Sequence, residues 1–164
     1  MTIRTPEHFA GPITDAFARA RELTEPVFVP APFYTDDRGW SLMNMLQGVM
    51  GPEGQVNYSV QYPGVVKAWH RHRLQTDFWI CLMGHIKVGV HRDADATSWA
   101  IVTGEKRPGI VVIPPTLWHG AASVGSEPAG LFYYVTHAFN PATPDEERRA
   151  FDSVPAFPWG VQHR

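Results

Sequence analysis

The stretch GVVKAWHRHRLQTDFWICLMG, residues 64–84, brings two histidines and an aspartate close together in the chain. Under the two-residue period of a strand, His70 and His72 point to one side and Lys67 to the other. Asp77 follows beyond the next turn, and its carboxylate together with two imidazoles suits divalent zinc, iron, nickel or manganese. The stretch therefore predicts a metal site. A hydrogen bond between His72 and Asp77 in a polar pocket would explain the same residues without an ion.

Composition indicates a soluble protein with one domain. The chain has 164 residues, 44% of them hydrophobic, which is enough for one core. Its 14 basic and 16 acidic side chains are scattered, with a net charge of -2, so nucleic acid and anionic membranes are not expected partners. No apolar run approaches the roughly 20 residues that span a bilayer. We expect a cytoplasmic protein whose single cysteine, Cys81, is a buried thiol.

The remaining pattern predicts many short strands between two helices. Apolar residues recur at helical spacing over residues 5–25, within an N-terminal extension of residues 1–28. Residues 29–140 consist of short β-branched and aromatic segments separated by turn-forming stretches, which is typical of an all-β barrel or sandwich. Residues 141–164 are expected to form a short C-terminal helix and a tail, with Thr143 as the N-cap.

The segment QVNYSVQY, residues 55–62, alternates polar and apolar side chains. This period predicts a strand with one packed face and one wet face. We expect the apolar face, with Val56 and Tyr58, to be packed. The polar face, with Gln55 and Asn57, is expected in solvent unless it lines a cavity.

The spacing around the histidines resembles the first motif of the cupin superfamily, G(x)5HxH(x)4E(x)6G, with Asp77 at the glutamate position. The later stretch GIVVIPPTLWHG is similar to the second cupin motif, in which Pro114 and His119 fall into place. The resemblance implies an all-β cupin double-stranded β-helix, a jelly-roll-like barrel. It also implies one divalent metal ion, with the candidate ligands His70, His72, Asp77 and His119.

Motifs on either side of the histidines resemble one cupin branch, the dTDP-4-dehydrorhamnose 3,5-epimerases and their relatives that act on nucleotide-linked keto sugars. The stretches FYTDDRG, QVNYS, GVVKAWH, IPPTLWHG, LFYYVTHAFNP and FDSVPAFPW follow the order of that family's motifs over residues 33–159. The resemblance implies an epimerase or isomerase that acts next to the carbonyl of a sugar. It also implies a homodimer that needs no organic cofactor.

Carried over by position, the family's catalytic histidine falls on His70, its partner aspartate on Asp152 and its acid–base tyrosine on Tyr133. The positions that bind the nucleotide or the sugar fall on Arg38, Gln55, Asn57 and Lys67. Removing a proton beside a ketone needs a base with a pKa near neutrality, which a histidine held by a carboxylate supplies. A tyrosine across the ring can return the proton.

The two roles suggested for His70 exclude each other, because a nitrogen that binds a metal cannot also accept a proton. With an ion at the site, proton transfer falls to Tyr133, Tyr134 or His137. Tyr133 and His137 share a side of their strand and are the better candidates. Without an ion, His70 with Asp152 is the base. Ordinary packing in the barrel would also explain Tyr133.

Two other functions fit the same residues. A metal-dependent oxygenase would hold ferrous iron on the four ligands and bind dioxygen at open positions. A non-catalytic barrel would bind a sugar or a small acid. Oxygen consumption would distinguish the oxygenase from an isomerase. Exchange of solvent deuterium into a keto sugar would argue against the non-catalytic barrel.

Overall fold

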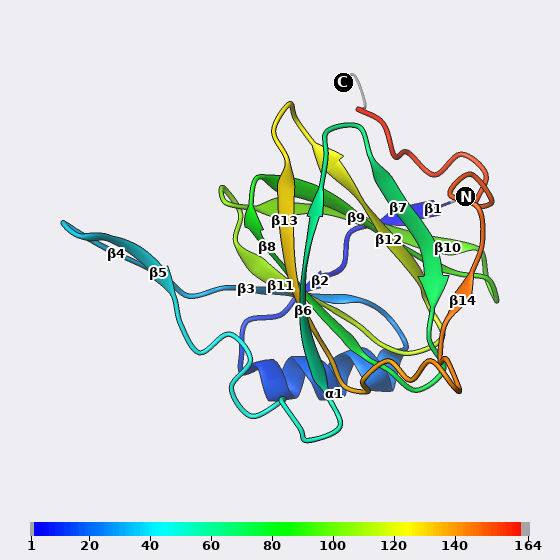
Figure 1. Ribbon diagram of the computed structural model, residues 1–164, viewed down its shortest axis with the longest axis horizontal. Helices are drawn as coiled ribbons and strands as arrows, with labels where there is room; N and C mark the ends of the chain where they lie inside the picture. Colours follow the sequence, from blue (N-terminus) through cyan, green and yellow to red (C-terminus); the bar gives the residue numbers. More distant parts are fainter. Residues whose placement is uncertain (1, 162–164) are drawn as a thin grey trace.

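The computed structural model describes residues 2–161, which form two six-stranded sheets packed face to face, one helix and a two-stranded hairpin (Figure 1). In sheet order, sheet A contains β1 (Thr2–Arg4), β10 (Thr97–Gly104), β9 (His85–Arg92), β12 (Trp118–Val124), β7 (Val66–Arg71) and β14 (Glu147–Arg148). Sheet B contains β2 (Glu7–His8), β3 (Val27–Pro30), β11 (Gly109–Ile113), β8 (Asp77–Met83), β13 (Ala129–Val135) and β6 (Gln55–Gln61). The all-β prediction is confirmed.

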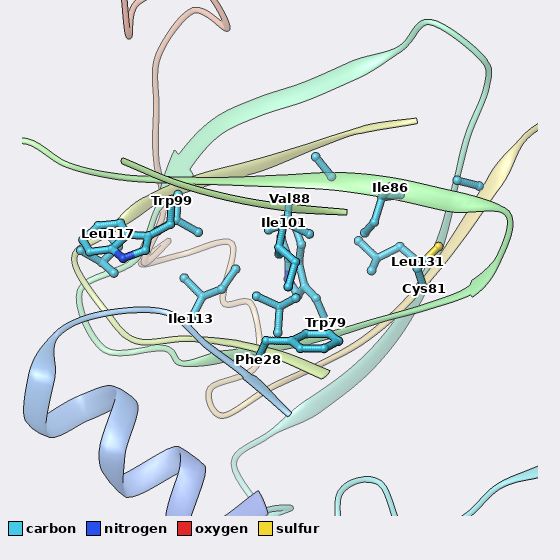
Figure 2. Packing of buried hydrophobic residues seen from close by; sticks show 14 residues of the cluster. Phe28, Trp79, Cys81, Ile86, Val88, Trp99, Ile101, Ile113, Leu117 and Leu131 are labelled. Atoms are coloured by element: carbon cyan, nitrogen blue, oxygen red, sulfur yellow. The ribbon is translucent and has the colours of Figure 1, made fainter. Parts of the chain in front are cut away.

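The core fills the space between the two sheets (Figure 2). Trp79 and Cys81 reach it from β8, and Ile86 and Val88 reach it from β9. Burial raises the pKa of the Cys81 thiol to about 11, as expected of a buried cysteine. The other face of β8 is covered as well, because Phe78 packs in a second cluster with the helix. Burial on both faces explains why β8 is continuously apolar after Asp77 instead of alternating.

The N-terminal helix is shorter than the sequence predicts. It is α1 (Ile13–Leu23), and it begins directly after Pro12, whose extended backbone fits an N-cap. Residues 2–8, expected within a helical extension, contain β1 and β2, which pair in parallel with β10 and β3. These strands use the backbone groups that the predicted longer helix would have used. Within residues 2–161, no helix is long and apolar enough to cross a membrane.

The predicted C-terminal helix is wrong for the described part of residues 141–164. These residues form turns and β14, which pairs with β7. Asp145, expected in the first turn of a helix, accepts hydrogen bonds from the backbone N–H groups of Arg73 and Leu74, both at 2.9 Å. The capping signals after Thr143 are local, and these tertiary partners outweigh them. The rest of the predicted tail, residues 162–164, lies outside the described residues.

Strand β6 has the reverse orientation to the one predicted. Its polar residues Gln55 and Asn57 face inward, whereas Val56 and Tyr58 are 44% and 57% exposed. Alternation along β6 is therefore confirmed, but the apolar residues lie on the outside. β6 is an edge strand of sheet B, so the helix that covers the middle of the sheet leaves this outer face open.

The hairpin of β4 (Phe33–Asp36) and β5 (Gly39–Leu42) extends away from the body of the molecule (Figure 1). Phe33 and Trp40 stack on each other with ring centroids 5.4 Å apart, yet both are at least half exposed. The hairpin pairs with neither sheet.

A third cluster covers the outer face of sheet A. Trp69 and Trp118 pack there against Val154 and Phe157 of the C-terminal segment. The indole of Trp69 donates to the carbonyl of Phe151 at 2.9 Å. The chain after β14 therefore lies on the outside of sheet A, behind the strand that carries His70.

Candidate functional site

A cavity of about 710 Å³ opens between the two sheets. Its mouth lies beside β6 and β14, which are both edge strands, and its floor is formed by central strands. Its polar and charged lining residues are Gln55, Asn57, Ser59, Gln61, Lys67, His70, His72, Gln75, Asp77, Tyr133, Glu146, Arg148 and Arg149.

The four predicted metal ligands converge at the floor. His70 on β7 lies directly opposite His119 on β12, and their ring centroids are 4.3 Å apart. His72 follows the end of β7, and Asp77 begins β8. One ligand atom from each of the four lies within 4.8 Å of the others. The structure thus brings together the three residues that the opening stretch suggested and His119, which the resemblance added.

Backbone carbonyls orient two of the three imidazoles. Nδ1 of His119 donates to the carbonyl of Leu117 at 2.9 Å, and Nδ1 of His72 donates to the carbonyl of Asp145 at 2.5 Å. With Nδ1 protonated, each Nε2 keeps its lone pair. Metal-binding histidines are commonly held in this way.

Asp77 is buried and ionised. Oδ1 accepts a hydrogen bond from the side-chain amide of Gln75 at 2.6 Å, and Oδ2 accepts one from the indole of Trp79 at 3.0 Å. Burial alone would raise its pKa, but the nearby His119, His72 and Gln75 outweigh burial and hold the pKa well below its usual range. A negative charge is thus kept among three imidazoles.

The cluster has an unused ligand atom. Nε2 of His119 is buried and faces Oδ2 of Asp77 at 3.4 Å, and no hydrogen bond of good geometry within residues 2–161 reaches it. Burial, reinforced by His119, lowers the pKa of His70 well below its usual value, so His70 is neutral at pH 7. Free lone pairs on imidazoles beside an ionised carboxylate fit a divalent cation.

Lys67 lines the cavity because the pairing of β7 with β12 is irregular. His70 pairs with His119, but Lys67 pairs with Ala121, so two residues between these pairs on β7 oppose one, Gly120, on β12. Such a bulge re-aims a side chain. Nζ of Lys67 consequently donates to Oγ of Ser59 at 2.8 Å. The prediction that Lys67 and His70 point to opposite sides is wrong, whereas the place of Lys67 beside the cavity agrees with a binding role.

The three candidates for proton transfer lie in different places. Tyr133 lines the cavity, and burial, with the charges of Asp77 and Glu146, raises its pKa. Tyr134 is buried on the opposite face, where its hydroxyl accepts the N–H of Gly51 at 2.8 Å. His137 lies beyond the end of β13, 3.8 Å from the carboxylate of Glu53, and is not among the lining residues. The prediction that His137 shares the pocket with Tyr133 is wrong, because strand alternation ends at Val135.

Two other predicted residues are not brought to the cavity. Asp152 is exposed on the segment outside sheet A, and no hydrogen bond or ion pair within residues 2–161 joins it to His70. Arg38 lies in the turn of the projecting hairpin, with a side chain 85% exposed and paired with Asp36. The predicted His70–Asp152 pair is therefore not formed.

Sequence reasoning missed the lining residues Gln75, Glu146 and Arg148. Gln75 lies two residues before Asp77, a spacing that carries no recognisable signal. Glu146 and Arg148 are two residues apart, which suits one face of a strand. We missed this pattern because we predicted a helix, not a strand, for these residues.

The chain matches the family described as polysaccharide biosynthesis C-terminal domain over residues 34–147. It is 40% identical over 101 residues to the "Probable low-salt glycan biosynthesis epimerase Agl13" of Haloferax volcanii, covering 58% of this chain and 65% of that protein. It is 32% identical over 139 residues to the spore coat polysaccharide biosynthesis protein SpsL of Bacillus subtilis, covering 80% of this chain and 92% of SpsL. The chain thus spans just under two thirds of the first relative and most of the second.

The fold is similar to the crystal structure of a dTDP sugar isomerase from Desulfovibrio desulfuricans. The TM-score is 0.72 at 22% identity, and the match covers 84% of this chain and 92% of that chain. This likeness confirms the predicted cupin fold. Together with the similarity to a named epimerase, it confirms the resemblance to the sugar-epimerase branch of the cupins.

Proposed function

The chain belongs to the polysaccharide biosynthesis C-terminal domain family, and on that premise we propose that it is an epimerase or isomerase that acts next to the carbonyl of a nucleotide-linked keto sugar. One observation carries the proposal. A single cavity contains a buried cluster of imidazoles with a carboxylate and, on the facing sheet, the phenol of Tyr133. The similarity to a protein named as an epimerase supports the same reaction class.

We further propose that His70, His72, Asp77 and His119 hold one divalent ion. The unpartnered Nε2 of His119 and the ionised Asp77 support this assignment. The absence of a bond between His70 and Asp152 also favours it, because an unpaired imidazole of lowered pKa is a poor base. An ion held by these residues would supply positive charge beside the carbonyl oxygen of the substrate.

In this proposal, the proton that leaves the carbon beside the carbonyl passes to solvent water in the cavity, and Tyr133 is the group that delivers a proton back to that carbon. Its raised pKa keeps the phenol protonated at neutral pH, which suits a general acid. Tyr133 pairs with Trp79 on β8, which places it on the same inner face of sheet B as Asp77. Neither Tyr134 nor His137 reaches the cavity to share this role.

The polar wall of β6 is proposed to bind the sugar and nucleotide. The side-chain amide of Gln55 donates to Oδ1 of Asn57 at 2.6 Å, so the two side chains support each other. Asn57 and Lys67 present donors to the cavity, and Lys67 adds a positive charge. Amides and an ammonium group suit hydroxyls and phosphates.

The working form is proposed to be a homodimer. The outer face of β6 exposes Val56, Tyr58 and Val60 in a row, and the hairpin exposes Phe33 and Trp40. A two-stranded hairpin is marginally stable alone, so both surfaces would gain by packing on a second copy. The same packing would allow Arg38 to approach a cavity of the other copy.

Light scattering tests the dimer by measuring the molar mass in solution. The wild type should have twice the mass of one chain, and the Tyr58→Glu variant should have the mass of a single chain. A monomeric wild type would rule the dimer out.

The decisive experiment is proton exchange in heavy water. The protein is incubated with nucleotide-linked 4-keto sugars, and deuterium next to the carbonyl is followed by NMR or mass spectrometry. Incorporation that requires Tyr133 supports the proposal. Consumption of dioxygen without deuterium incorporation would support an oxygenase instead, and binding without either would leave a non-catalytic sugar-binding protein.

A further inference from the structure

Residues 145–149, the C-terminal strap, bring to the cavity a pair of opposite charges to which the proposed function assigns no contact with the substrate. Glu146 and Arg148 form an ion pair and both line the cavity. Glu147 between them points to the other side, where it binds Arg71 at 2.8 Å. Arg148 pairs directly opposite His70 on β7. Alternation along a strand thus aims one charge pair at the site and Glu147 away from it.

Hydrogen bonds to the backbone of neighbouring segments hold the strap at both ends. At one end the carboxylate of Asp145 binds the N–H groups that follow His72, including those of Arg73 and Leu74, each at 2.9 Å. At the other end Arg149 and Trp69 exchange two backbone hydrogen bonds, of 3.0 and 3.1 Å. The position of the strap therefore does not depend on the ion pair between Glu146 and Arg148.

Arg148 differs from the other cations along the cavity. Lys67 is bound to Ser59 and to the carbonyl of Val60. Arg149 is bound to Asp93 at 3.0 Å through one nitrogen, and its side chain is only 23% exposed, with its other two guanidinium nitrogens buried and without a partner within residues 2–161. The side chain of Arg148 is 78% exposed, and its partner Glu146 is only 22% exposed. A ligand that enters through the mouth therefore meets the guanidinium of Arg148, whose single acidic partner can be exchanged for another anion.

We propose that Arg148 binds the diphosphate of the substrate and that Glu146 holds the guanidinium until the diphosphate displaces it. The inference rests on the proposed function, because a sugar whose ring reaches His70 and Tyr133 at the floor carries its diphosphate toward the mouth. A guanidinium binds phosphate oxygens through two parallel hydrogen bonds. The carboxylate of Glu146 repels the same anion, so the pair makes affinity depend on the number of negative charges that the ligand carries.

The test uses two variants, Arg148→Gln and Glu146→Gln, that break the same ion pair. A purely structural pair would make both variants change binding in the same direction. The proposal requires the two variants to change binding in opposite directions.

Binding of dTDP and UDP to the full chain is measured by titration calorimetry at low ionic strength. We expect Arg148→Gln to weaken binding about 10- to 100-fold, as loss of a charged hydrogen bond does. Glu146→Gln should tighten binding by about threefold, as loss of an exposed repulsion does.

Glu147→Gln is the matched control, because it removes the same charge from the neighbouring residue on the outer side of the strap. Its affinity for dTDP and UDP should stay within about twofold of the wild type. Unchanged binding by Arg148→Gln, or a shift of both variants in one direction, would overturn the inference alone. A wild type that binds no nucleoside diphosphate would overturn the proposed substrate class as well. If Arg148→Gln does not fold, Glu146→Gln decides: tighter binding supports the inference, and unchanged or weaker binding contradicts it.

Discussion

The floor and the mouth of the cavity are built in opposite ways. At the floor, Asp77 and His119 are each 2% exposed and lie on central strands of the two sheets. At the mouth, Asn57 and Arg148 lie on β6 and β14, which have a neighbouring strand on one side only. Packing surrounds the floor residues on all sides, whereas the mouth residues lie at open sheet edges. The difference teaches that substitutions at the mouth should alter binding more than the proposed chemistry.

The largest effect should come from the floor. We expect His72→Ala to lose the ion and to lower the exchange rate by at least about 100-fold, because the loss of a ligand exceeds the effect of altering the group that orients it. Metal content per chain, measured by mass spectrometry, and the deuterium exchange rate check this. A variant that keeps both its metal and its activity would remove His72 from the cluster's function.

The next largest effect should come from Tyr133, and it should show that proton delivery can be lost while the metal is retained. Tyr133→Phe keeps the ring and removes the hydroxyl, so we expect full metal content and an exchange rate lowered about 10²- to 10⁴-fold. The pH profile of the exchange rate should also lose its basic limb, since the raised pKa belongs to this phenol. Normal exchange would show that Tyr133 only packs in the barrel.

A smaller effect is expected at the mouth. Asn57→Ala removes a polar group from the wall of β6 and leaves Gln55 without its side-chain acceptor. We expect KM to rise about tenfold with little change in kcat, as loss of uniform binding does. A fall in kcat with unchanged KM would contradict this prediction, because it would mean that Asn57 acts in the chemical step and not in binding.

The smallest effect is expected outside the cavity. Asp152→Asn should leave metal content, the exchange rate and the unfolding temperature unchanged, because Asp152 is exposed and has no bond to His70. This outcome would distinguish the chain from enzymes in which an aspartate holds the catalytic histidine. Loss of activity would mean that the C-terminal segment rearranges to bring Asp152 to His70.

The cluster at the floor was predictable because strand spacing points His70 and His72 to one side with Asp77 after one turn, and the resemblance to the second cupin motif adds His119. The structure brings these four residues together. The alternation of β6 was equally plain. The alternation does not say which face of β6 points inward, because that depends on the cavity and on the open edge of sheet B.

The mouth was less predictable because tertiary pairing decides it. The bulge beside Lys67 follows from an irregular register between two strands that lie far apart in sequence. Residues 145–149 have the composition of a helix start, but Asp145 caps the turn after His72 instead. Local propensity is a weak guide where a distant backbone offers partners.

The strap also bears on how this chain tolerates insertions and deletions. Four of its five charged residues run Glu146, Glu147, Arg148, Arg149, so these two glutamates are each followed two positions later by an arginine. A shift of one residue exchanges the inward and outward sides of a strand. Here the loss of one residue before the strap would replace the Glu146–Arg148 pair with Glu147 and Arg149, which are chemically the same pair, whereas the gain of one would bring in Asp145 and Glu147, two acids. The connection between β13 and β14 could therefore lose a residue in evolution while the cavity still presents one acid and one guanidinium.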